Sequence, residues 1–115
     1  MSRKASQVHP DAHSPEAALR QMRAAVAAGR HFVVTRVFDR LPELGLTPAE
    51  VRDALETALQ EVTLNDCKPP DDPYDPPGHG FVWYSKQFNC RMYLKFRLEG
   101  KKPVCVLYSF HRAEH

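Results

Sequence analysis

The sequence predicts a small α+β domain in which N-terminal helices pack on one face of a three- to four-stranded antiparallel sheet. Two patterns support this prediction. Apolar residues recur at helical spacing across the first half of the chain, and residues 81–111 alternate between apolar and polar side chains in three runs separated by short turns. With 43% hydrophobic residues among 115, the chain can bury one modest core, so residues 14–115 are expected to form a single domain.

The first helix is expected over about residues 15–28. Ser14 can cap its first turn, Pro15 suits the first helical position, and Gly29 supplies a stop. The apolar stripe consists of Ala18, Leu19, Met22, Ala25 and Val26. Residues 1–13 are polar and show no periodicity, which predicts a flexible tail.

The next stretch is compatible with two structures. Residues 32–34 could start a strand, but residues 35–41 also have the pattern of a short helix that ends before a proline. We favour the short helix, with Val37, Phe38 and Leu41 directed towards the core.

A second long helix is expected after Gly45. The segment from Thr47 to Glu50 is a capping-box sequence. The stripe that follows it consists of Val51, Leu55, Ala58, Leu59 and Val62. Both stripes are expected to pack against the apolar side of the sheet, leaving the other side open.

The segment between the last helix and the sheet is rich in proline. Residues 62–67 are compatible with an edge strand, and residues 69–80 are expected to form a stiff surface loop. Asp residues and His79 in this loop suggest Mg²⁺ or Ca²⁺ ligands, but their spacing matches no metal-binding loop. We therefore expect no metal and no other cofactor. Lys68 leads into the sheet and could reach its open side.

The run from residue 91 to residue 98 distinguishes the two faces of the sheet. Its even positions are all apolar. Its odd positions are Arg91, Tyr93, Lys95 and Arg97. Because successive side chains of a strand point to opposite faces, one face is apolar and the other is cationic with one phenol.

Burial also selects the strand register. A turn of three residues after Glu99 places Tyr93 opposite Ser109 and pairs apolar residues with each other on the other face. A turn of two residues would place the polar Ser109 opposite the apolar Met92, so it is rejected. A tight connection at residues 88–89 places Lys86 beside Arg91. The predicted cationic face therefore consists of Tyr84, Lys86, Arg91, Tyr93, Lys95, Arg97, Ser109 and His111, with no acidic residue among them.

Charge and composition restrict the function classes. The net charge is only +2, yet residues 81–115 hold seven lysines and arginines against two glutamates. Cations neutralise phosphates and phenol rings stack on bases, so this face suits single-stranded nucleic acid, although a solvated face of a half-buried sheet gives the same pattern.

No apolar run is long enough to span a bilayer or to form a signal peptide, which predicts a cytoplasmic protein without a membrane partner. Three cysteines without close spacing suggest neither a zinc site nor a redox motif.

Two short motifs carry a resemblance to a known family. The sequence Met92-Tyr93-Leu94-Lys95, followed by residues 106–111, VLYSFH, resembles the closing hairpin of the motility quorum-sensing regulator (MqsR) family of bacterial toxins. The resemblance implies a RelE-like fold and the toxin of a type II toxin–antitoxin system. Such a toxin is a metal-independent mRNA endoribonuclease (mRNA interferase) that needs no ribosome, and a cognate antitoxin protein neutralises it.

The resemblance also suggests which residues act. The family's hairpin tyrosine falls on Tyr93, its terminal lysine falls on His111, and its lysine before the sheet corresponds to Lys68. Where the family has glutamine after the tryptophan, this chain has Tyr84. These departures concern sequence specificity more than the class of reaction.

Metal-independent RNA cleavage needs a base for the 2′-hydroxyl, cations for the phosphorane and an acid for the leaving oxygen. Histidine changes its charge near neutral pH, so His111 is the expected principal acid or base. Arg91 and Lys95 would stabilise phosphoryl charge, and Tyr93 or Lys68 would position or protonate the scissile group. Further substrate contacts are expected from Tyr84, Lys86, Arg97 and Ser109. The alternatives are a non-catalytic RNA-binding module and a protein-interaction or immunity domain that uses the same face.

Overall fold

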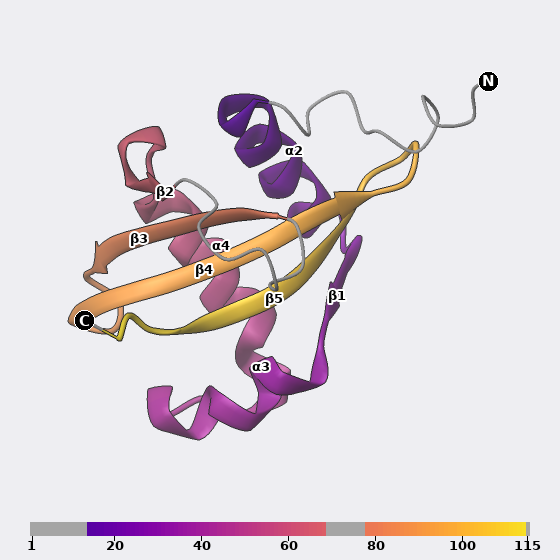
Figure 1. Cartoon of the computed structure of the whole chain (residues 1–115). Coiled ribbons are helices and arrows are strands. Elements are labelled where there is room, and N and C mark those ends of the chain that lie inside the picture. Colours follow the sequence, from indigo (N-terminus) through magenta and orange to yellow (C-terminus); the bar gives the residue numbers. More distant parts are fainter. Residues whose placement is uncertain (1–13, 69–77, 115) are drawn as a thin grey trace.

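The computed structural model describes residues 14–68 and 78–114, which form a five-stranded mixed sheet with helices on one face (Figure 1). The strands are β1 (His31–Val33), β2 (Cys67–Lys68), β3 (His79–Ser85), β4 (Cys90–Glu99) and β5 (Val104–Arg112), in the order β1-β5-β4-β3-β2. The helices are α2 (Pro15–Ala27), α3 (Thr35–Arg40) and α4 (Val51–Glu61), with short 3₁₀ turns η2 (Leu41–Leu44), η3 (Pro48–Glu50) and η4 (Leu64–Asp66). The α+β class is confirmed. The expectation of a purely antiparallel sheet of three to four strands is wrong, because β1 pairs with β5 in parallel.

Local signals position α2 and α4 as predicted. Ser14 Oγ accepts a hydrogen bond from Ala17 N at 3.2 Å, and Gly29 takes a left-handed φ of 81° after the helix. The capping box of Thr47 and Glu50 forms ahead of α4. In Figure 1 both helices lie behind the sheet, on the same face of it.

The segment after α2 forms both of the structures that its sequence allows. β1 pairs with β5 through Phe32 and Val106, and α3 follows directly. Val37 and Leu41 are buried as expected. Phe38 is 37% exposed, so its predicted inward position is wrong.

The boundaries of β2 and β3 differ from those predicted. The chain forms a 3₁₀ turn over η4 where an edge strand was expected, so β2 is only two residues long. β3 begins at His79, inside the range predicted as loop. The remainder of the predicted loop, residues 69–77, lies outside the described residues, as does the predicted tail over residues 1–13.

A β-bulge changes the register between β4 and β5. The connecting turn holds four residues, Gly100 to Pro103, so Glu99 pairs with Val104 and the first half of β5 is shifted by one position from the prediction. The irregularity between Lys95 and Phe96 then inserts Tyr108 as an extra residue.

The shift and the bulge decide which side chains of β5 enter the core. Cys105 and Leu107 face the core, and Val104 and Val106 face the other side, which is the reverse of the predicted arrangement. Beyond the bulge, Phe110 is buried as predicted.

The β3–β4 hairpin keeps the predicted faces but not the predicted partners. Trp83 pairs with Met92 and Tyr84 with Arg91, two residues away from the expected register. The shift is even, so every side chain stays on its predicted face. The core lies between this face and the helices, and its sheet residues are Phe81, Trp83, Met92, Leu94, Phe96, Leu98, Cys105, Leu107 and Phe110. Among the helices of residues 14–68 and 78–114, none has the length and apolar character needed to cross a membrane.

Candidate active site on the helix-free face of the sheet

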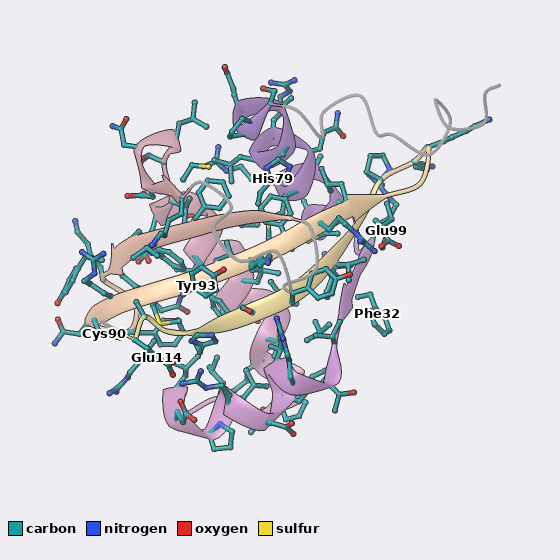
Figure 2. All side chains as sticks on the ribbon, viewed as in Figure 1. Phe32, His79, Cys90, Tyr93, Glu99 and Glu114 are labelled. Atoms are coloured by element: carbon teal, nitrogen blue, oxygen red, sulfur yellow. The ribbon has the colours of Figure 1, made fainter. Side chains whose placement is uncertain are left out.

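The helix-free face is the side of the sheet turned away from α2 and α4. Figure 2 shows Tyr93 projecting from this side of β4. Cross-strand partners share a face, so the register sorts its side chains into rows that run across the strands, with neighbouring rows about 7 Å apart. Around the predicted site residues its members are Gly80, Val82 and Tyr84 of β3, Arg91, Tyr93, Lys95 and Arg97 of β4, and Ser109 and His111 of β5, with Lys68 of β2 at the edge. Glu99, Val104 and Val106 belong to the same face nearer the β4–β5 turn.

The central row brings together the two residues that were predicted to be nearest to the chemistry. Tyr93 and His111 are direct cross-strand partners, and their ring centroids are 5.5 Å apart with the planes inclined at 51°. The predicted partners were Ser109 for Tyr93 and Arg91 for His111. The bulge at Tyr108 produces the closer pairing, because it returns the last residues of β5 to the helix-free face.

A backbone contact orients the imidazole of His111. Its Nδ1 lies 2.7 Å from the carbonyl oxygen of Arg112, and a carbonyl can only accept, so Nδ1 carries the proton of the neutral ring. The other nitrogen, Nε2, is then the one with a free lone pair. The contact therefore favours Nε2 of His111 as a proton acceptor.

A glycine makes room for the phenol of Tyr93. A Cβ at Gly80 would lie 3.3 Å from the Tyr93 hydroxyl oxygen, so the ring extends over the bare backbone of β3 towards β2. Gly80 pairs with Lys68, which is exposed and belongs to the same face. The register agrees with the prediction that Lys68 reaches the open side of the sheet, in the row that contains Gly80 and Lys95, although β2 holds only two residues.

The next row contains Lys95, Ser109 and an arginine from outside the sheet. Lys95 pairs with Ser109, and the two residues are only 8% and 7% exposed. Arg36 of α3 donates from Nη2 to Ser109 Oγ at 3.3 Å and from Nε to the Tyr108 carbonyl at 2.8 Å. This row is therefore less open to solvent than the alternating pattern predicts.

The row on the other side of Tyr93 is the most exposed. Tyr84 is 57% exposed and pairs with Arg91, which is also exposed. The Tyr84 hydroxyl donates to the side-chain oxygen of Asn89 in the adjacent turn. An aromatic ring beside an unburied guanidinium suits a base and its phosphate.

Two predicted contact residues differ from expectation. Arg97 forms an ion pair with Glu99 and lies over the ring of Tyr108, 5.6 Å from its centroid. Glu99 shares the face of Arg97, so the expectation of a face without acidic residues is wrong. Lys86 is exposed but lies in the β3–β4 turn, so it extends from the end of the sheet and not from a strand.

The other described histidines lie on the core side. His79 contacts the ring of Phe96, with centroids 5.6 Å apart. His31 pairs with Cys105, and burial followed by the charge of Arg52 lowers its pKa. Among the histidines of the described segments, His111 alone belongs to the helix-free face. Within the same segments, no group of three His, Cys, Asp or Glu side chains is arranged to hold a metal ion.

Two residues of this site were missed by sequence reasoning. Gly80 had a local signal, because it directly precedes the strand-forming run that starts at Phe81, and a glycine in a strand often marks a close approach to the backbone. Arg36 had none, because it reaches β5 across more than 70 residues of sequence. No protein-family model matches the sequence, and no curated protein matches it.

Proposed function

We propose that the protein is a metal-independent endoribonuclease that cleaves single-stranded RNA on the helix-free face, as expected for an mRNA interferase toxin of a toxin–antitoxin system. The observation that carries the proposal is the cross-strand pair of Tyr93 and His111, whose rings lie 5.5 Å apart between two rows that bear cations. A phenol, an imidazole and cations within one substrate's reach are the groups that this chemistry needs.

The reaction is a transesterification within the RNA. Nε2 of His111 takes the proton of the 2′-hydroxyl, and the resulting oxygen attacks the adjacent phosphorus. The bond from phosphorus to the 5′-oxygen breaks, and that oxygen receives a proton from Tyr93 or Lys68. The products are a 2′,3′-cyclic phosphate and a free 5′-hydroxyl. Arg91 and Lys95 flank Tyr93 along β4 and would stabilise the charge on the phosphorane.

The test uses the purified protein with a defined single-stranded RNA in the presence of a chelator. We expect discrete fragments with 2′,3′-cyclic phosphate ends. His111→Ala should lower the cleavage rate by about 10²- to 10⁴-fold, because it removes the proton acceptor. Tyr93→Phe tests the phenol without removing the ring. Full activity of His111→Ala would overturn the assignment of the base, and no fragments from the parent protein would overturn the nuclease.

A second candidate is RNA binding without cleavage. The exposed pair of Tyr84 and Arg91 favours it, because stacking and phosphate contact need no proton transfer. In that case the same RNA would be retained in a salt-dependent way and recovered intact. The chelator experiment therefore separates the two functions.

A further inference from the structure

Arg36 connects α3 to the helix-free face. Its Nε donates to the Tyr108 carbonyl oxygen at 2.8 Å, and its Nη2 donates to Ser109 Oγ at 3.3 Å. These two contacts hold one edge of the planar guanidinium against β5. The residue itself is exposed.

The fold explains why the carbonyl of Tyr108 needs a donor. β1 leaves β5 after Val34 N donates to the Leu107 carbonyl, so no strand of the described residues lies beside the rest of β5 on that edge. Tyr108 is also the extra residue of the bulge, where ladder pairing is interrupted. Arg36 satisfies this carbonyl from outside the sheet.

The structural role uses only part of the guanidinium. Five N–H groups are present, and two of them hold β5, which leaves three donors and the full charge. Among the described residues no carboxylate forms an ion pair with Arg36. Arg40, one helical turn further along α3, is paired with both Glu43 and Glu114. Within the described residues, carboxylates therefore balance the charge of Arg40 but not that of Arg36.

Arg36 also lies one row from the proposed reaction centre. Ser109, which it contacts, is two residues from His111 and pairs with Lys95, so the row of Arg36 adjoins the row of Tyr93. A single strand whose scissile phosphate sits between Tyr93 and His111 would pass its next phosphate over this row. We propose that Arg36 binds that neighbouring phosphate of the RNA, with Ser109 and Tyr108 holding the guanidinium in place. This inference rests on the proposed function.

The test compares Arg36→Gln with the parent protein and with Arg20→Gln. Glutamine keeps a donor for the Tyr108 carbonyl but removes the charge, and Arg20 is an exposed arginine of α2 on the other side of the molecule. The probe is a 2′-O-methyl RNA oligomer, which cannot be cleaved through its 2′-oxygen. Fluorescence anisotropy gives its Kd over a range of salt concentrations.

We expect Arg36→Gln to reduce the slope of log Kd against log salt by about 0.7, the value for the loss of one phosphate contact on a single strand. Arg36→Lys should restore most of the slope because it keeps the charge. Arg20→Gln should leave the slope unchanged.

Equal slopes for Arg36→Gln and the parent would overturn the inference and leave Arg36 as a structural donor. A second outcome is that Arg36→Gln shows the expected loss of slope with the 2′-O-methyl RNA, while the parent protein does not cleave the unmodified RNA. This outcome would overturn the nuclease and retain Arg36 as a phosphate contact. The two failures therefore give different results.

Discussion

The two rings of the proposed centre are held by contacts of different kinds. The Nδ1–H of His111 is bound to the backbone carbonyl of Arg112, whereas the phenol of Tyr93 occupies space that Gly80 leaves empty. The first contact selects the nitrogen that can accept a proton, and the second determines where the hydroxyl lies. Small changes at neighbours that touch no substrate should therefore alter the chemistry.

Gly80→Ala tests this dependence. The added methyl would lie 3.3 Å from the Tyr93 hydroxyl oxygen and 3.4 Å from Cε1 of its ring, so the ring must move by a few tenths of an ångström. We expect kcat/KM for RNA cleavage to fall by roughly tenfold, because misplaced catalytic groups lose much of their effect. The urea midpoint should change little.

The control for Gly80→Ala is the same substitution in a Tyr93→Phe background. If Gly80 acts through the phenol, Gly80→Ala should lower kcat/KM by a smaller factor when the hydroxyl is already absent. An undiminished effect in the double variant would show that Gly80 acts by another route.

At the scale of the elements, the periodic segments were predictable and the irregular ones were not. Alternation over β4 separates its two faces because one of them is buried, and the caps of α2 and α4 lie within a few residues of the helices they start. β1 is three residues long and pairs in parallel, so it has too few positions to show a period. The bulge at Tyr108 depends on how β5 meets its neighbours, which alternation does not encode.

The candidate site shows the same division. The sequence placed Tyr93, Lys95, Ser109 and His111 on one face, and the register agrees. It could not supply the pairing of Tyr93 with His111, because that pairing requires both the four-residue turn and the bulge. The contact of Arg36 with β5 joins residues far apart in the chain and left no local signal.

Glu61, at the end of α4, ties that helix to the β3–β4 hairpin. Its Oε1 accepts from Trp83 Nε1 at 2.9 Å and its Oε2 from the backbone N–H of Gln87 at 3.0 Å. Burial by itself raises the pKa of this carboxyl, but hydrogen bonds from Trp83, Ser85 and the backbone outweigh it, so the pKa lies below its ordinary value of 4.5. The carboxylate therefore stabilises the folded state at neutral pH.

Glu61→Gln should lower the free energy of unfolding at pH 7 by about 1–3 kcal/mol, because the amide cannot accept both bonds as well as the carboxylate does. Because the pKa of the Glu61 carboxyl is lower in the folded chain than in the unfolded chain, its ionisation stabilises the fold at pH values above the unfolded pKa. This contribution is lost as the pH falls through the folded pKa. The difference in the free energy of unfolding between the parent protein and Glu61→Gln should therefore shrink below about pH 4.5.

Trp83 is the single tryptophan of the chain, so urea unfolding followed by its fluorescence measures both proteins. A difference that stays constant from pH 7 down to pH 3 would contradict the role of the charged carboxylate. Glu16→Gln, at the start of α2, is a matched control and should show no comparable loss.

At the scale of the whole molecule, the same three long strands form the core on one side and the proposed site on the other. Slipping β4 by one residue would bring Tyr93 and Lys95 under the helices and Met92 and Leu94 onto the other face. Burial of the apolar residues therefore holds the register on which the proposed site depends. The positions of the site residues are as stable as the core, so global unfolding and loss of the site should be one event.

The thiol of Cys105 reports this event, because it lies on the core side of β5, next to β1. It is buried, and burial raises its pKa to about 12. Since the thiolate is the reactive form, Cys105 should be inert towards Ellman's reagent in the native protein at pH 8. A variant that keeps only Cys105 should react at least about a thousandfold more slowly than the unfolded chain, as expected for a domain stable by 5 kcal/mol or more.

The labelling rate of Cys105 should rise with urea along the same slope as tryptophan-detected unfolding, because only global opening exposes this thiol. The matched variant keeps only Cys67, whose pKa is raised by partial burial and which lies in the two-residue edge strand β2. Its thiol should react without added urea, because opening of an edge strand costs less than unfolding of the core. Fast reaction of Cys105 in native buffer would show that the β1–β5 edge of the sheet opens independently of the core. The contact between Arg36 and Ser109 at this edge would then be less stable than the core.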